Sequence, residues 1–181
     1  VDVSAQSAMT WTMLNSMEAH AIQGFDTERT GATLELAMTV PLRHDAADGF
    51  VVMVPRGPTV VPMLPAMIDD GIVDAGWADE DWSSWDHRII EGEPTQVSYA
   101  EVVDAIDRYC VQYTKQELFS FGMDNGVSIA PMNTVADLAV FEHLGPRRFW
   151  AEQEQTGRTV PGGFLTIDDE RLPVGSGPPS I

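Results

Sequence analysis

GVSIAPMNTVADL, residues 126–138, is the stretch of sequence that most directly indicates the fold. It opens with a glycine, which after an asparagine is typical of the left-handed cap at the end of a helix. The apolar residues that follow predict a strand, and Pro131 fixes its own backbone φ angle. Asn133 or Thr134, with Asp137, then predicts the start of another helix. The pattern therefore predicts helix, strand and helix in succession, with a Pro-x-Asn turn that is either a site or a structural joint; the sequence favours the joint.

Three helices are predicted upstream. SYAE at Ser98–Glu101 and TKQE at Thr114–Glu117 have the Ser/Thr-x-x-Glu pattern of a capping box, so each predicts the start of a helix. The third covers Ala5–Ile22, where apolar residues recur at helical spacing and indicate a packed scaffold helix. Its apolar face comprises Ala8, Trp11, Met13, Leu14, Met17 and Ala21.

Strands are predicted on both sides of these helices. AMTVPL at 37–42 and FVVMVP at 50–55 flank Asp48-Gly49, a strong turn dipeptide, and predict a β-hairpin. Near the C-terminus, residues 147–167 predict two strands joined by a turn at Thr156-Gly157.

Two segments between the hairpin and residue 98 are harder to interpret. VVPMLPAMIDDG at 60–71 predicts a short helix whose start is left open by Pro62 and Pro65, because prolines fit best in a first turn. Residues 74–94 are acidic and contain three tryptophans. They indicate a recognition surface or, as the sequence favours, an irregular loop pinned to the core by its aromatic side chains.

Composition limits the possible functions. The chain has 181 residues and a formal charge of −18, from 10 basic and 28 acidic residues. Such a charge argues against nucleic acid and anionic membranes as partners, because both are bound through Lys and Arg. Cys110 is the single cysteine, so no internal disulfide is possible, which fits a reducing compartment and predicts a cytoplasmic location.

No catalytic or metal-binding motif is evident. The four histidines are far apart in sequence and none has a zinc-binding spacing. There is no nucleophile elbow, phosphate-binding loop or dinucleotide-binding glycine motif. DEDW at Asp79–Trp82 could hold a hard cation but lacks the alternating ligands of a calcium loop. Cys110 fits a buried small side chain better than a catalytic thiol. We therefore expect neither a metal nor a cofactor.

Four segments, in the right order, resemble family III CoA-transferases, which include formyl-CoA transferase, carnitine CoA-transferase and α-methylacyl-CoA racemase. GVSIAPMNTVADL resembles the family's GIPCAPVNTPEDL pattern, VDVSAQSAM its VDVSLLEAA start, and DAADGFVVMV its TADGYVVI hairpin. RRFWAEQEQTGRTVPGGFLTI resembles the later strands that lead to a PGPPF element. The matching positions of the first segment are Gly126, Ala130, Pro131, Asn133, Thr134 and Leu138.

The resemblance implies an α+β fold, with a scaffold helix and a small α/β domain that contains a β-hairpin and a mixed sheet. It implies strand end, scaffold helix and linker of the large domain at 1–33, the small domain at 34–150, and return strands with an extended tail at 151–181. It also implies an interlocked homodimer, or pairing with the family's N-terminal half.

The resemblance further implies an enzyme that moves CoA between an acyl-CoA and a carboxylic acid, with coenzyme A as a substrate and no separate cofactor. The family's nucleophile is an aspartate upstream of the VDVS segment, so we expect no catalytic residue within this chain and no activity of the chain alone. Asp2 follows that position and is not the nucleophile. Arg56 and Gly57, in an exposed loop with a cation, are the predicted substrate-binding residues.

Three interpretations stay open at this point. The chain is a portion of such a transferase or of a racemase-like enzyme, a non-catalytic subunit of a heteromeric transferase, or an unrelated acidic interaction module that binds through its tryptophans. The third gains support only if the hairpin and the Pro-x-Asn turn do not share one small domain.

Overall fold

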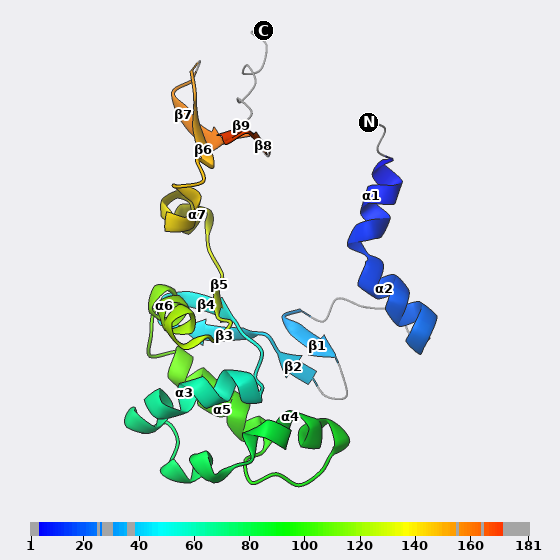
Figure 1. Ribbon diagram of the computed structural model, residues 1–181, viewed down its shortest axis with the longest axis vertical. Helices are drawn as coiled ribbons and strands as arrows, with labels where there is room; N and C mark the ends of the chain where they lie inside the picture. Colours follow the sequence, from blue (N-terminus) through cyan, green and yellow to red (C-terminus); the bar gives the residue numbers. More distant parts are fainter. Residues whose placement is uncertain are drawn as a thin grey trace. The chain divides into compact units, whose positions relative to one another are not determined.

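The computed structural model describes residues 4–24, 26, 31–35, 39–154, 156–163 and 165–171. The chain forms two compact units, Val1–Pro131 (unit 1) and Met132–Ile181 (unit 2). Figure 1 gives the order of the elements along the chain. No helix in the described ranges is long and apolar enough to cross a membrane.

Unit 1 begins with the predicted N-terminal helix, in three pieces. These are α1 (Ala5–Thr12), α2 (Leu14–Glu18) and a short π-helical turn (Ala19–Gln23) that ends at Gly24. Gly24 has a φ of 74°, the left-handed conformation that glycine adopts readily at a helix end. The predicted helix is therefore confirmed, and the strand end predicted for residues 1–3 lies outside the described residues.

The sheets of unit 1 are small and antiparallel. β1 (Thr33–Glu35) pairs with β2 (Thr39–Pro41), while β3 (Arg43–Ala46), β4 (Gly49–Val52) and β5 (Ala130–Pro131) form one sheet in the order β3-β4-β5. Every strand pair in the described part of the chain is antiparallel, where a mixed sheet was expected. The α+β class is confirmed.

The hairpin is present, but one of its strands differs from the prediction. Ala46 pairs with Gly49 across the two-residue turn Ala47-Asp48, and this register pairs Arg43 with Val52. Strand 37–42 was predicted as the partner, yet residues 39–41 pair with β1 instead. The true partner, RHDA at 43–46, was missed because its sequence is mostly polar. His44 is nevertheless buried in this fold.

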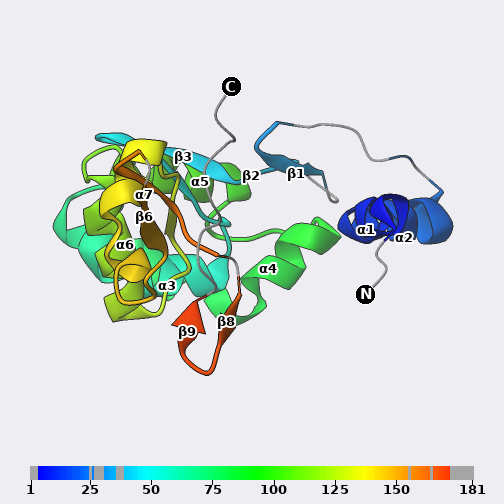
Figure 2. The same cartoon turned by 90° about the horizontal axis from the view of Figure 1, so that it is seen from above.

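Helices α5 and α6 contact the β3-β4-β5 sheet, and two further helices pack beside them. The helices are α5 (Tyr99–Cys110) and α6 (Lys115–Asn125), then α3 (Gly57–Asp69), which contacts α5, and α4 (Trp82–Glu91), which packs beside α3. Figure 2 shows α5 directly beside β3. The core between sheet and helices includes Val51, Met53, Val60, Met63, Met67, Trp85, Val102, Ile106, Cys110 and Leu118.

Helix α3 begins earlier than its prolines suggested. It starts at Gly57 and continues through Pro62 and Pro65, each of which lacks an N–H for the carbonyl four residues earlier. Those carbonyls belong to Pro58 and Val61, which are both exposed. The missing bonds therefore belong to exposed residues, while Val60, Met63, Leu64 and Met67 lie on the buried side of the helix.

The tryptophan segment is helical, so the predicted irregular loop is wrong. It forms a 3-10 helix (Ala75–Asp79) followed by α4. Aspartates cap both: Asp74 accepts a hydrogen bond from the amide of Gly76, and Asp81 from that of Ser83. The predicted anchoring to the core is confirmed, because Trp85 is buried and Trp77 and Trp82 pack against the core.

Unit 2 contains short elements. They are α7 (Val135–Val140), a 3-10 turn (Glu142–Leu144), the hairpin β6 (Trp150–Gln153) with β7 (Arg158–Pro161), and a second hairpin β8 (Thr166–Ile167) with β9 (Glu170–Arg171). The predicted hairpin around Thr156-Gly157 is confirmed. The division at 33 and 150, which came from the resemblance, stays a prediction.

Candidate functional site

The predicted substrate-binding residues lie at the first turn of α3. Arg56 is the extended N-cap residue and is exposed, whereas Gly57 is buried. The amide of Gly57 donates to the Asp86 carboxylate over 2.8 Å, and the amide of Thr59 donates to the carbonyl of Arg56 over 2.9 Å. The segment is therefore a closed helix start rather than an exposed loop. Of the two predicted residues, only Arg56 is exposed to solvent. Contact between Arg56 and a substrate stays a prediction.

Helix α4 determines how this helix start is built. A Cβ atom on Gly57 would lie 2.9 Å from the backbone carbonyl oxygen of Trp82, closer than real Cβ contacts allow. Gly57 thus permits the backbones of α3 and α4 to approach, and Asp86 of α4 then reaches the amide of Gly57. Asp86 follows Gly57 by 29 residues, so no local sequence signal could have identified this contact.

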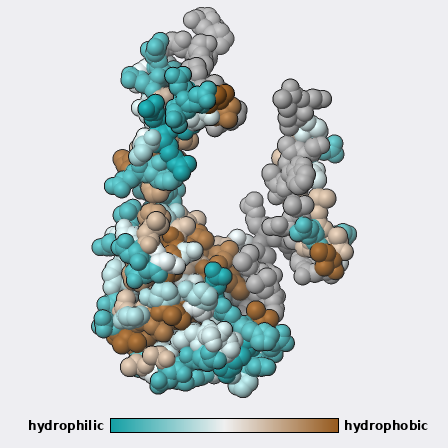
Figure 3. Space-filling view, viewed as in Figure 1, coloured by the Kyte–Doolittle hydropathy of each residue, from teal (hydrophilic) through white to brown (hydrophobic). Residues whose placement is uncertain are grey.

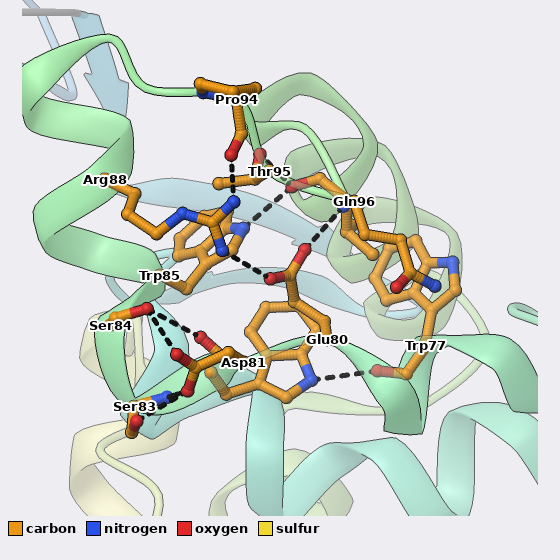
Figure 4. Close-up of polar contacts among 12 residues, drawn as sticks. Trp77, Glu80, Asp81, Ser83, Ser84, Trp85, Arg88, Pro94, Thr95 and Gln96 are labelled. Atoms are coloured by element: carbon orange, nitrogen blue, oxygen red, sulfur yellow. Dashed lines mark hydrogen bonds and ion pairs between the residues drawn. The ribbon is translucent and has the colours of Figure 1, made fainter.

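The cluster around Glu80 fixes α4 in place (Figure 4). The buried Glu80 carboxylate accepts hydrogen bonds from Arg88 over 3.3 Å and from the amide of Val97 over 2.8 Å, and Arg88 also donates to the carbonyl of Pro94. A buried carboxylate needs such partners, because removing it from water is costly. This cluster therefore joins the 3-10 helix, α4 and the 94–97 segment.

The tryptophans of this region have structural partners. The indole N–H of Trp82 donates to the carbonyl of Trp77 over 2.9 Å, and that of Trp85 donates to the carbonyl of Val97 over 2.7 Å. Successive ring centroids from Trp77 through Trp82 and Trp85 to Tyr99 are 6.1, 5.4 and 6.2 Å apart. These contacts support internal packing over partner recognition.

The acidic DEDW segment does not assemble a cation site in the described residues. Glu80 is bonded to Arg88 and Val97, and Asp81 caps α4. Hydrogen bonds from Ser83 and Ser84 lower the pKa of Asp81. Within the described ranges, no three His, Cys, Asp or Glu side chains are grouped so that they could hold a metal ion.

The Pro-x-Asn turn has the geometry of a joint. The Thr134 hydroxyl accepts a hydrogen bond from the amide of Asp137 over 3.2 Å, and the Asp137 carboxylate accepts one from the amide of Thr134 over 2.8 Å. Thr134, rather than Asn133, therefore caps α7. Pro131 pairs with Val51 of the hairpin, so the strand before this turn and the hairpin belong to one sheet. That observation weighs against an unrelated interaction module.

Two buried titratable groups lie between β3 and α5. His44 is fully buried, and its Nδ1 lies 2.7 Å from a carboxylate oxygen of the half-exposed Asp107. Burial, with the nearby charge of Asp107 as a smaller cause, raises the pKa of the Cys110 thiol to about 12. A thiol with this pKa stays protonated at neutral pH, so Cys110 is not an activated nucleophile.

The outer face of β4 and of the chain that follows it is the surface that sequence reasoning missed. From Phe50 to Arg56, exposed and buried residues alternate strictly. Phe50, Val52, Val54 and Arg56 face outward and form what we call the outer strip. Figure 3 shows apolar surface among polar surface on this unit. The strip could not be found from the sequence, because FVVMVP is apolar at the buried and exposed positions alike.

Comparisons with known proteins agree on the fold. The CAIB/BAIF family protein from Brucella suis matches with a TM-score of 0.65 and 16% identity, over 96% of this chain. Rv3272 from M. tuberculosis matches with a TM-score of 0.56 and 17% identity, over 98% of this chain. This chain corresponds to 42% of the length of each of these two structures. A search of curated proteins found no match.

The family assignment comes from the sequence of the whole chain. The sequence pattern described as CoA-transferase family III matches residues 1–181. The two solved structures support the same α+β architecture. This chain therefore belongs to CoA-transferase family III.

Proposed function

We propose that this chain is a portion of an enzyme that transfers CoA between an acyl-CoA and a carboxylic acid. The observation that carries the proposal is the family match over all 181 residues. The shared sheet of the hairpin and Pro131 supports it, because that sheet joins two of the segments that resemble the family.

The chemistry proposed for the complete enzyme needs a carboxylate nucleophile. That carboxylate would attack the acyl-CoA thioester, forming a mixed anhydride and releasing the CoA thiolate. The thiolate would then attack the enzyme's carbonyl carbon in the anhydride, which gives an enzyme-bound CoA thioester and releases the donor as a free carboxylate. Attack by the acceptor carboxylate on this thioester would release the CoA thiolate and give a second anhydride. The thiolate would then attack the acceptor's carbonyl carbon, which forms the new acyl-CoA and frees the enzyme carboxylate. From the family resemblance we expect the nucleophile upstream of the VDVS segment, and we propose that residues 1–181 alone do not catalyse transfer.

Within this chain we propose a supporting role for the described residues. Arg56 would contact the anionic substrate, with Gly57 and Asp86 holding the start of α3 in position. The complete enzyme would act in the cytoplasm as a homodimer, and the single buried thiol fits a reducing compartment.

A trapping experiment tests the proposal. The isolated chain and the complete polypeptide that contains it are incubated with an acyl-CoA and a free acid, followed by hydroxylamine trapping and intact mass measurement. We expect transfer and a trapped carboxyl group only in the complete polypeptide. A CoA adduct on the isolated chain would contradict the proposal that residues 1–181 alone do not catalyse transfer. Absence of transfer by the complete polypeptide with every acyl-CoA tried would contradict the proposed function.

A further inference from the structure

Helix α6 ends in an Asn-Gly pair that the function proposed above does not use. Asn125 is the last residue of α6, and Gly126 follows it with a φ of 69°, the left-handed conformation that glycine adopts readily. Both residues are exposed, and a Cβ atom on Gly126 would meet no atom within 4 Å. Gly126 therefore adds no side chain beside the Asn125 carboxamide, and the space that such a side chain would occupy is open.

The helix cap explains Gly126 but not Asn125. Asparagine is a weaker helix former than alanine, leucine or lysine, and an exposed position at a helix end accepts any of them. Nδ2 of Asn125 donates a hydrogen bond to the carbonyl of Phe121 over 2.9 Å, which stays within the last turn of α6. What distinguishes this position is its chemistry, a carboxamide directly before a glycine amide.

An asparagine before glycine loses ammonia without an enzyme, and asparagine counts among the thermolabile residues. The backbone nitrogen of Gly126 gives up its proton and attacks Cγ of Asn125. A bond forms between that nitrogen and Cγ, the bond from Cγ to Nδ2 breaks, and ammonia leaves with the proton. Water then opens the resulting cyclic imide. Attack of water at Cγ gives aspartate, and attack at the main-chain carbonyl carbon gives isoaspartate.

Two hydrogen bonds of the last turn restrain this reaction. The amide of Gly126 donates to the carbonyl of Gly122, so its proton is engaged, and Nδ2 of Asn125 is bonded to Phe121. The reaction therefore requires the last turn to open. Helix ends fray with small opening free energies, so the restraint delays the reaction without preventing it.

The same turn joins α6 to β5, which contact each other (Figure 1). A Cβ atom on Gly122 would lie 2.6 Å from the carbonyl oxygen of Val127 and 3.3 Å from Cβ of Ile129, so the helix and the chain after it approach closely. Val127 and Ile129 are buried just before β5. Isoaspartate adds a carbon atom to the backbone between α6 and Val127. Both products replace the amide donor of Asn125 by a negative charge, which is unfavourable at a helix C-terminus.

We propose that Asn125 is a modification site that deamidates to aspartate and isoaspartate when the last turn of α6 opens, and that the product loosens the contact between α6 and β5. The proposal does not depend on the transferase function. Of the asparagines at 15, 125 and 133, only Asn125 precedes a glycine, so conversion should begin there.

Timed incubation of the whole chain in mildly alkaline buffer, folded and in concentrated urea, tests the site. Peptide mapping by mass spectrometry follows the loss of the amide, and an isoaspartate-specific methyltransferase identifies the branched product. We expect Asn125 to convert before Asn15 and Asn133 in the folded chain, at about one tenth of its rate in urea, because a helix end opens readily.

Two variants sharpen this measurement. Asn125→Gln keeps an amide donor but forms the larger cyclic imide far more slowly, so conversion at position 125 should be lost. Asn133→Gln is the matched control and should leave the rate at Asn125 unchanged. Earlier conversion at Asn15 or Asn133, or no conversion at Asn125 in the folded chain while the unfolded chain converts, would overturn the site. Equal rates in the folded and unfolded chain would overturn the requirement for opening.

Hydrogen exchange tests the consequence for the chain after α6. The amide of Val127 donates to the carbonyl of Gly122 over 2.9 Å, so its exchange reports on this turn. Asn125→Asp, which reproduces one product, should exchange this amide about two- to fivefold faster than Asn125→Gln, because of the charge at the helix end. The deamidated chain, which also contains isoaspartate, should exchange it faster still. Thermal melts establish that both variants fold, and equal exchange in all three proteins would overturn the proposed loosening.

Discussion

At the scale of single residues, Cys110 gives the clearest chemical expectation. Its thiol is fully buried between α5 and the sheet, and burial raises its pKa to about 12. We predict that the native chain does not react with a thiol-specific aromatic disulfide at about pH 8, because the reactive thiolate is scarce and inaccessible. One thiol per chain should react after unfolding in urea. Rapid reaction of the native chain would show that this part of the core opens readily.

Glu101 gives a second expectation at this scale. Hydrogen bonds from the Ser98 hydroxyl and then the Ser98 amide lower the pKa of the Glu101 carboxyl below its ordinary value of 4.5. A lowered pKa means that the ionised carboxylate stabilises the folded state above the unfolded pKa, and that this stability is lost as pH falls through the folded pKa. We predict that Ser98→Ala raises the pKa of Glu101 and reduces this acid-dependent loss.

Carbon-detected NMR titration of Glu101, with urea unfolding on both sides of pH 4.5, measures both effects. Glu117 is the internal control, because hydrogen bonds from the amide and then the hydroxyl of Thr114 lower its pKa, and Ser98→Ala should leave that pKa unchanged. An unchanged Glu101 pKa in the variant would show that the hydroxyl is not its main partner.

At the scale of elements, the contact between α3 and α4 depends on the absence of a side chain at Gly57. Gly57→Ala would place a methyl group 2.9 Å from the carbonyl oxygen of Trp82, so one backbone must shift. We predict a loss of about 1–3 kcal/mol in the free energy of unfolding, as for other overpacked sites. Gly145→Ala is the control, since its Cβ would meet only an ordinary contact at 3.7 Å. Equal effects of the two substitutions in urea unfolding would refute this account.

The cap of α7 is a second prediction at this scale. Thr134→Ala with Asn133→Ala should cost roughly 1–2 kcal/mol through the lost helix cap, and Thr134→Ala alone should account for most of it. Hydrogen exchange of the α7 amides measures the change. Turnover of the complete enzyme should be nearly unaffected, because the turn is a joint. A large loss of turnover with normal thermal melting would instead identify the turn as a functional site.

The elements also show which parts of this fold can be predicted from the local sequence. The boxes at Ser98, Thr114 and Thr134 were found because each capping bond links residues three positions apart. The hairpin partner was missed because the side-chain partner of the buried His44 is Asp107, which lies 63 residues away. The first turn of α3 depends in the same way on Asp86. The outer strip was invisible because exposure in β4 is set by the helices behind it, and its exposed and buried residues are equally apolar.

At the scale of the whole molecule, charge and exposed apolar surface act in opposite directions. The formal charge of −18 favours solubility and repels like copies at low salt. Against this, Met9, Met13 and Met17 of the N-terminal helix are 63%, 55% and 51% exposed, and Ile22 is 81% exposed. Exposed apolar side chains gathered on one helix are typical of an association surface. Because of the repulsion between like charges, such association therefore depends on the salt concentration.

The last prediction is that the isolated chain associates through this helix, with itself or with the remainder of the enzyme. Full burial of a methionine side chain stabilises a contact by roughly 1.5–3 kcal/mol. Partial burial of Met9, Met13 and Met17 is therefore enough to oppose the screened repulsion between negatively charged chains. Dimerisation should strengthen as salt rises, because the repulsion is screened over about 10 Å at 0.1 M salt. Sedimentation equilibrium over a salt and concentration series measures it. Met9→Gln/Met13→Gln/Met17→Gln should shift the equilibrium toward monomer, whereas Met123→Gln, at a position 71% exposed on α6, should not. A monomer at every salt and concentration, with the helix amides protected from exchange, would show that the helix packs within its own chain and that the interlocked dimer does not apply to this protein.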